Sequence, residues 1–187
     1  MHPSVARLVE LMPPRPGSGD LIDWDQVAER SGLRFPADYR DFVAVYGCGS
    51  INNAFYVAAP CDEESGARGP QSLASCTELG FGLLGLEPGN DPDLAGWISW
   101  ATDCEANHAF WDTTDPDPDK WPVLELARHG DWVPHRGGMV DFLIDLLTNT
   151  DDFWMAGPVE SGQRVFMHWR EEQRLRDAGE DPWQHVD

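Results

Sequence analysis

Apolar residues near the amino terminus recur every three or four positions, which is the spacing of an amphipathic helix. This first stripe consists of Val5, Leu8, Val9 and Met12. A linker rich in proline and glycine is predicted at 13–19. A second helix should begin after Asp23, a residue type that caps helix N-termini, and end at Gly32, which tolerates the left-handed conformation.

Two stronger apolar stripes predict two further helices. The first of these is expected to begin at Pro36, whose fixed φ suits the first helical position, and to reach Gly47. Its stripe consists of Tyr39, Phe42, Val43 and Tyr46. The second follows the glycine pair at 137–138. Its stripe consists of Met139, Phe142, Leu143, Leu146 and Leu147. Charges of alternating sign predict a last helix over 170–178.

β-forming residues dominate several stretches between these helices. Residues 50–57 are predicted to form a strand that ends before Pro60. Frequent glycine, proline and acidic residues from 61 to 90 predict a loop with at most short elements. Periodicity leaves open whether 164–169 forms a strand or begins the last helix.

Two β-hairpins are predicted in the second half of the chain. Residues 97–102 and 107–113 form the first, joined by a four-residue loop. Side chains alternate along 97–102, so one face of this strand could pack on helices. Residues 123–126 and 132–134 form the second hairpin.

The order of these elements, helices then strands then helices, predicts an α+β single domain with an antiparallel sheet flanked by helices. A chain of 187 residues is long enough for one such core. We expect an N-terminal helix and linker at 1–19, an α+β core at 20–148, and a helical extension at 149–187 packed on the same domain. The chain lacks a secretion signal, a bilayer-length apolar run and any CxxC pair, so we expect reduced thiols and a cytoplasmic location.

The acidic charge of the chain changes the picture of its partners. The formal net charge is −20, and residues 61–160 hold 20 acidic against 4 basic residues. Such a field repels nucleic acid and anionic membranes and attracts basic proteins. A role in solubility alone is the competing interpretation. A partner-binding acidic surface would be drawn from Asp62, Glu63, Glu64, Asp115, Asp117 and Asp119.

Nine tryptophans are many for this length, and some could anchor a protein interface. Trp97 and Trp121 stand near the ends of predicted elements, close to acidic residues. We expect both to contribute to partner binding, with burial in the core as the competing interpretation.

Catalytic and metal-binding patterns are weak. Residues that could ligate zinc gather on the first hairpin, but neighbours on a strand point to opposite faces, so few can converge. These residues are Asp103, Cys104, Glu105, His108 and Asp112. The prolines within 115–119 interrupt a calcium-loop pattern, and no phosphate-loop, dinucleotide or hydrolase motif occurs. We therefore expect no cofactor, no metal and no enzymatic activity, with a metal enzyme built on Cys104 and His108 as a minor alternative.

Three motifs in order resemble the SUKH superfamily, which includes bacterial immunity proteins and fungal cell-wall-assembly regulators. They are the run 32–42 followed by 46–51, the pair 100–103 and 109–112, and a third set at 122–123, 132 and 142–143. The signature positions are Pro36, Tyr39, Phe42, Gly47, Gly49, Trp100 and Asp112. The resemblance covers about 20–148 and implies a structural role for these positions, an α+β fold, and neutralisation of a nuclease or deaminase toxin by direct binding. A regulatory scaffold is the alternative that the fungal relatives suggest.

Overall fold

The computed structural model describes residues 1–60, 72–85, 94, 96–148, 153–155 and 163–184. Within these residues the chain forms one seven-stranded antiparallel sheet with strand order β6-β5-β4-β3-β2-β1-β7. The strands are β1 Gly49–Ile51, β2 Phe55–Val57, β3 Trp97–Asp103, β4 His108–Asp112, β5 Val123–Leu126, β6 Trp132–His135 and β7 Phe166–His168. The helices are α1 Pro3–Leu11, α2 Trp24–Ser31, α3 Ala37–Val45, α4 Leu73–Leu84, α5 Met139–Thr148 and α6 Trp169–Asp177, with a short 3-10 turn, η2, at Pro118–Lys120.

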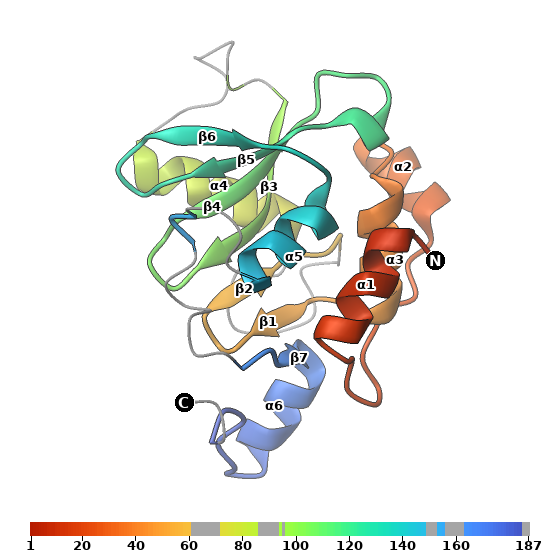
Figure 1. The fold of residues 1–187 in the computed structure, drawn as a ribbon, viewed down its shortest axis with the longest axis vertical. Helices are drawn as coiled ribbons and strands as arrows, with labels where there is room; N and C mark the ends of the chain where they lie inside the picture. The colour runs from red at the N-terminus through yellow and green to blue at the C-terminus, as the bar shows by residue number, and fades with distance from the viewer. Residues whose placement is uncertain (61–71, 86–93, 95, 149–152, 156–162, 185–187) are drawn as a thin grey trace.

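Helices cover both faces of this sheet, which confirms the predicted α+β single domain (Figure 1). The larger apolar core lies on the face covered by α1, α3 and α5, where Trp100 and Trp111 meet Tyr39 and Phe142. On the opposite face, α4 packs along β3 over a smaller cluster. This cluster consists of Phe81, Leu94, Trp97, Phe110, Leu124 and Leu126. Strand β3 is therefore buried on both faces, whereas alternation predicted one helix-covered face.

The local signals for helix ends are accurate. The Asp23 side chain accepts a hydrogen bond from the N–H of Gln26, and Gly32 ends α2 at a φ of 72°. Pro36 precedes the first residue of α3 and occupies the N-cap position, one residue before the predicted place. The hairpins β3–β4 and β5–β6 and the helix α5 are confirmed. Among the described residues, no helix has the length and apolar character required to cross a bilayer.

The predicted strand at 50–57 is wrong, because the chain reverses within it. Asn52 and Asn53 have φ values of 51° and 58°, and they form the turn between β1 and β2. Asparagine adopts this left-handed conformation more readily than most residues, and two such residues in succession suit a tight hairpin. The pair is the sequence signal that the strand prediction overlooked.

The predicted loop at 61–90 contains a twelve-residue helix, α4. A reciprocal capping box between Ser72 and Ser75 starts it, and Gly85 ends it in the left-handed conformation. Gly80 and Gly82 lie inside the helix, where glycine costs stability and normally indicates a loop. A Cβ atom at Gly80 would lie 3.0 Å from both His108 and Phe110, so glycine lets α4 approach the sheet closely.

The tail contributes to the sheet as well as adding a helix. The ambiguous segment 164–169 contains β7, which pairs antiparallel with β1, and α6 begins directly after it at Trp169. This helix agrees with the prediction for 170–178 to within one residue at each end. The described part of the extension therefore completes one edge of the sheet.

Candidate functional site

Of the six carboxylates predicted to form an acidic partner-binding surface, the three that the structure describes already have partners within the protein. Asp62, Glu63 and Glu64 lie outside the described residues. The other three carboxylates lie in the β4–β5 connection, and each has a partner within the protein. Asp115 Oδ1 accepts from the N–H of residue 117 at 2.8 Å, and Asp117 pairs with Lys120 at 3.0 Å. Asp119 Oδ1 accepts from the N–H of Ala37 at 2.7 Å. These carboxylates stabilise a turn and the N-terminus of α3, so part of their negative charge has a structural role.

Trp97 and Trp121 are not exposed anchors, which corrects their assignment to a partner-binding surface. Trp97 is 7% exposed, with its ring centroid 5.7 Å from that of Phe110. Trp121 is 6% exposed, packs edge-on against Phe35, and donates its indole N–H to the carbonyl of Asp115 at 2.7 Å. Both lie inward because each completes an aromatic cluster beside the sheet.

The signature positions have structural places in the fold. Tyr39, Phe42 and Trp100 are fully buried, and the Tyr39 hydroxyl donates to the carbonyl of residue 58 at 2.8 Å. Gly47 has a φ of 75°, and a Cβ there would meet the His168 ring at 2.5 Å, while a Cβ at Gly49 would collide with the backbone of β7. The N–H of Thr114 donates to Asp112, which stabilises the end of β4, and Pro36 precedes α3 as its N-cap residue.

The Cys104 and His108 pair does not form a site. Cys104 is exposed at the β3–β4 turn, whereas His108 is 1% exposed and points into the smaller core. Within the described residues, no group of three or more His, Cys, Asp or Glu side chains could hold a metal ion.

A buried row of hydrogen-bonded side chains around His108 has the residue types of a catalytic relay, but its cysteine is not in the thiolate form that nucleophilic catalysis requires. His108 Nδ1 lies 3.0 Å from Ser99 Oγ, which in turn lies 3.1 Å from Cys76 Sγ. Burial lowers the pKa of His108 to about 4 and raises the pKa of the Cys76 thiol to about 12. The thiolate is the nucleophilic form of cysteine, and at neutral pH this thiol stays protonated. These three side chains therefore form a hydrogen-bonded polar network inside the core.

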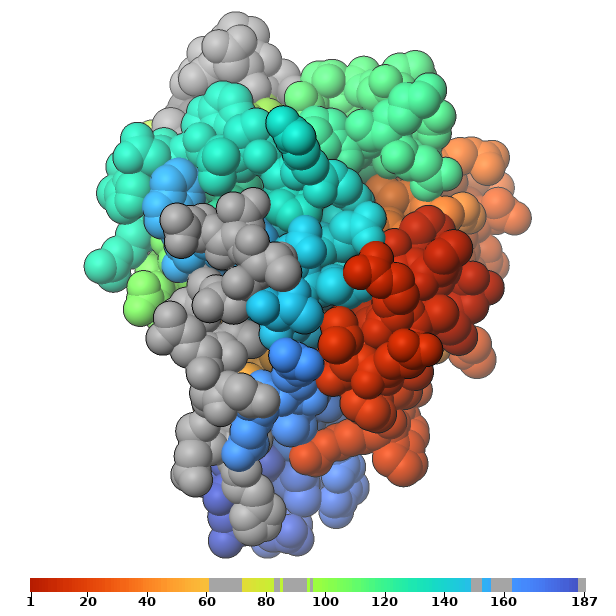
Figure 2. Space-filling view, viewed as in Figure 1, coloured from red at the N-terminus to blue at the C-terminus, as the bar shows by residue number. Residues whose placement is uncertain are grey.

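An exposed edge of the sheet was not predicted to bind a partner. Strand β6 lies at the end of the sheet, and its residues Trp132 and Val133 are 53% and 41% exposed. Trp154 is 38% exposed and packs edge-on against His129 in the β5–β6 turn at a centroid distance of 5.7 Å. Figure 2 shows the short stretch 153–155 against this hairpin. We call Trp132, Val133 and Trp154 together the β6 surface: Trp132 packs against Trp97 on the α4 side of the edge strand, and Val133 points to the α5 side.

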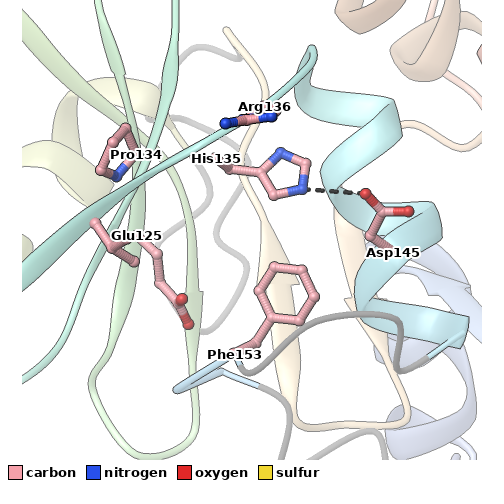
Figure 3. A pocket seen from close by; sticks show the side chains of 7 residues that line it. Glu125, Pro134, His135, Arg136, Asp145 and Phe153 are labelled. Atoms are coloured by element: carbon pink, nitrogen blue, oxygen red, sulfur yellow. Dashed lines mark hydrogen bonds and ion pairs between the residues drawn. The ribbon is translucent and has the colours of Figure 1, made fainter.

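A pocket of about 370 Å³ lies beside Val133, between β6, α5 and the stretch 153–155 (Figure 3). We call it the β6 pocket. It is lined by Glu125, Val133, Pro134, His135, Arg136, Asp145 and Phe153. His135 Nε2 donates to Asp145 Oδ2 at 3.1 Å. The imidazole packs against the rings of Phe142 and Phe153 at centroid distances of 5.1 and 5.7 Å. These contacts fix the ring in one orientation.

Buried polar groups hold the stretch 153–155 in place. Glu125, which is 2% exposed, accepts from the N–H of Met155 at 2.7 Å. Asn107 bridges two segments: its side-chain amide donates to the carbonyl of Trp154, and its oxygen accepts from the N–H of Arg128. The peptide group between Trp154 and Met155, next to Phe153, is thus anchored through both its carbonyl and its N–H.

The backbone of β6 favours recognition through side chains over the addition of another strand. The N–H of Ala127 donates to the carbonyl of Asp131 at 2.9 Å, which fixes the alternation of the antiparallel ladder. Backbone groups of Val133 therefore face β5, while those of Trp132 and Pro134 face outward. Proline has no N–H to offer there, and proline on an edge strand opposes pairing with another chain.

In the β6 pocket His135 is oriented by the Asp145 carboxylate. The described residues that line the pocket include no serine, threonine, cysteine or lysine beside this pair. What the pocket offers is carboxylates, an imidazole and an aromatic face.

Comparisons with known proteins give no relative. No family model matches the chain, and neither the curated proteins nor the solved structures contain a match.

Proposed function

We propose that this protein is a cytoplasmic, non-enzymatic binding module of the immunity type, which neutralises a basic toxin domain by covering its active-site cleft. The β6 surface carries the proposal. Two half-exposed tryptophans and an exposed valine lie on and beside the edge strand of the sheet, and the valine also lines the β6 pocket. Tryptophan is among the residues that most often dominate binding energy at protein interfaces.

The charge of the chain supports a basic protein as the partner. A net charge of −20 speeds the encounter with a basic surface and opposes binding of nucleic acid or an anionic membrane. Toxin nucleases and deaminases act on polyanions or their bases, so their clefts are basic. An acidic protein can therefore compete with the substrate of such an enzyme for the same cleft.

The resemblance of 20–148 to the SUKH superfamily supports the same function. The positions that carry it are core and backbone positions in this fold, as a family signature of structural residues would require. The residues proposed here to meet the partner lie elsewhere, at β6 and 153–155. Variation at these positions would let one fold neutralise different toxins.

Co-expression tests the proposal. Toxin domains encoded beside this gene are expressed in a bacterial host with and without the protein, and growth and co-purification are measured. We expect the protein to restore growth and to co-purify with one toxin domain in a complex that weakens as salt rises. Failure to rescue growth from any flanking toxin, with capture only of housekeeping proteins, would replace the immunity function by that of a regulatory scaffold.

A further inference from the structure

Two arginines flank the β6 surface, one at each end of strand β6. Arg128 lies in the turn before the strand, and Arg136 directly follows its last residue, beside His135 in Figure 3. Both side chains are exposed. Among the residues that the structure describes, neither guanidinium makes an ion pair, whereas the arginines of α6 pair with glutamates of the same helix. Both charges are therefore available to a partner.

These two arginines stand out in the charge pattern of the chain. Residues 61–160 hold 20 acidic and only 4 basic residues, and Arg128 and Arg136 are two of those four. The others are Arg68, which lies outside the described residues, and Lys120, which pairs with Asp117 at 3.0 Å. The most acidic part of the sequence thus places positive charge at both ends of the exposed edge strand.

The carboxylates described near β6 have contacts of their own. The Asp131 carboxylate lies 3.2 Å from the imidazole of His129, and the Asp145 carboxylate accepts from that of His135. Glu125 is 2% exposed and bonds to the backbone. Beside its apolar side chains, the described part of this edge therefore offers a partner two guanidiniums.

The chemistry of these groups favours a carboxylate in the partner. Guanidinium is a planar fork of N–H donors that matches the two oxygens of a carboxylate. Arginine and tryptophan are both enriched at protein interfaces. Trp132 and Val133 point to opposite sides of the strand, so a partner that covers the edge of the sheet reaches both. Four strand residues span roughly 14 Å, so both arginines fit within one interface of ordinary size.

We propose that the β6 surface docks on a segment of the protein partner in which apolar side chains are flanked by carboxylates that pair with Arg128 and Arg136. This inference rests on the proposed function and names the part of the toxin that β6 meets. The cleft of a nuclease or deaminase is basic where it holds phosphates, but its chemistry uses carboxylates, such as the glutamate of zinc deaminases and the acids that hold metal ions in nucleases. The acidic body of the protein suits the basic rim, and β6 suits the carboxylates.

Other occupants of this surface are less compatible with the charge of the chain. A nucleic acid would pair with the arginines, but its row of phosphates would meet a protein with a net charge of −20. A second copy of the chain would bring the same net charge and the same two arginines. A protein segment with isolated carboxylates avoids both forms of repulsion.

The probe is the tetrapeptide N-acetyl-Glu-Leu-Leu-Glu amide, which has as many residues as β6. Its two controls replace both glutamates by glutamine or by lysine. The indole N–H resonances of Trp132 and Trp154 in the full chain are followed by NMR at about 0.15 M salt, which screens long-range attraction. We expect the glutamate peptide to shift them with a roughly millimolar dissociation constant. The glutamine peptide should bind several-fold more weakly and the lysine peptide weakest.

Variants make the test specific. Arg128→Gln and Arg136→Gln should each lower the affinity for the glutamate peptide about two- to fivefold and leave that for the glutamine peptide unchanged. Arg34→Gln, at an exposed position between α2 and α3, changes the net charge equally and should leave both affinities unchanged. All three positions are exposed, so we expect each variant to keep the fold.

Three results would overturn the proposal: a lysine peptide that binds as tightly as the glutamate peptide, no indole shift with the glutamate peptide, or full affinity in both arginine variants. Indole shifts produced by an oligothymidylate in place of the glutamate peptide would also overturn it, because they would assign the surface to nucleic acid.

Failure of this inference and failure of the proposed function give different results. If a flanking toxin is neutralised but Arg128→Gln and Arg136→Gln bind it as tightly as wild type, the carboxylate contact is wrong and the immunity function stands. If the glutamate peptide binds as predicted but none of the flanking toxins is neutralised, the carboxylate contact stands and the immunity function is wrong.

Discussion

His168 Nε2 donates to the Asp20 carboxylate at 3.1 Å, which joins the strand at the carboxyl end of the chain to the linker before α2. The N–H of Arg170 donates to His168 Nδ1, so the ring proton lies on Nε2. Asp20 also accepts from the N–H of Cys48 at 2.9 Å and from the Arg170 guanidinium at 2.6 Å. One carboxylate thus fastens three segments together.

Asp20→Asn should destabilise the fold by about 2–3 kcal/mol, because it removes the charge from a set of partly buried hydrogen bonds. Urea denaturation measures this loss, and hydrogen exchange should show reduced protection of β7. Glu29→Gln on exposed α2 serves as the control. Unchanged protection of β7 in the variant would mean that the tail is held by other contacts.

The same carboxylate should make stability depend on pH. Burial alone raises the pKa of Asp20, but the hydrogen bonds from His168, Cys48 and Arg170, with the charge of His168, outweigh it and lower the pKa to about 2. A lowered folded pKa gives stability that is complete above the unfolded value of 3.8 and is lost as pH falls toward 2. Denaturation midpoints measured through this range should fall more steeply for wild type than for Asp20→Asn.

Asp119→Ala should cost about 1 kcal/mol of stability, because Asp119 accepts from the first N–H of α3 and Pro36 offers no side-chain cap. Asp117→Ala should have a smaller effect, since Asp117 pairs only with the exposed Lys120 and its neighbouring backbone. Thermal unfolding distinguishes the two variants. Equal effects would contradict the capping role of Asp119.

The glycines of α4 provide a matched pair. Gly80→Ala should destabilise the protein by about 1–3 kcal/mol, because the added Cβ would lie 3.0 Å from His108 and Phe110. A Cβ at Gly82 meets nothing within 4 Å, so Gly82→Ala should stabilise the helix by up to about 1 kcal/mol. Chemical denaturation of both variants tests the close approach of α4 to the sheet, and two changes of the same sign would refute it.

The sequence predicts those parts of the fold that local chemistry determines. Asp23 and Gly32 bound α2 because a cap and a left-handed residue act over one turn. Helix α4 was not predicted, because glycine normally indicates a loop. Gly80 is needed inside the helix since a larger residue would meet the side chains of β4, which lies far along the chain. The turn at Asn52 and Asn53 was a local signal that the strand prediction passed over.

The candidate site is less predictable than the fold. His135, Asp145 and Phe153 come from a strand, a helix and a later segment, and only tertiary packing brings them together. The net charge of the chain predicted a basic partner, and the prediction put the contact on acidic turns, whereas the structure exposes aromatic side chains at β6. Trp97 and Trp121 showed why exposure cannot be read from position near an element end, since both fill aromatic clusters.

The affinity of the β6 surface for the toxin tests the central claim most directly. Titration calorimetry with a flanking toxin domain compares wild type with the double variant Trp132→Ala and Trp154→Ala. The control is Leu21→Ala, which removes a fully exposed apolar side chain from the linker before α2. We predict at least about a thirtyfold loss of affinity in the double variant, as expected for interface hot spots, and no change in the control. Equal affinity of wild type and double variant would contradict binding through the β6 surface.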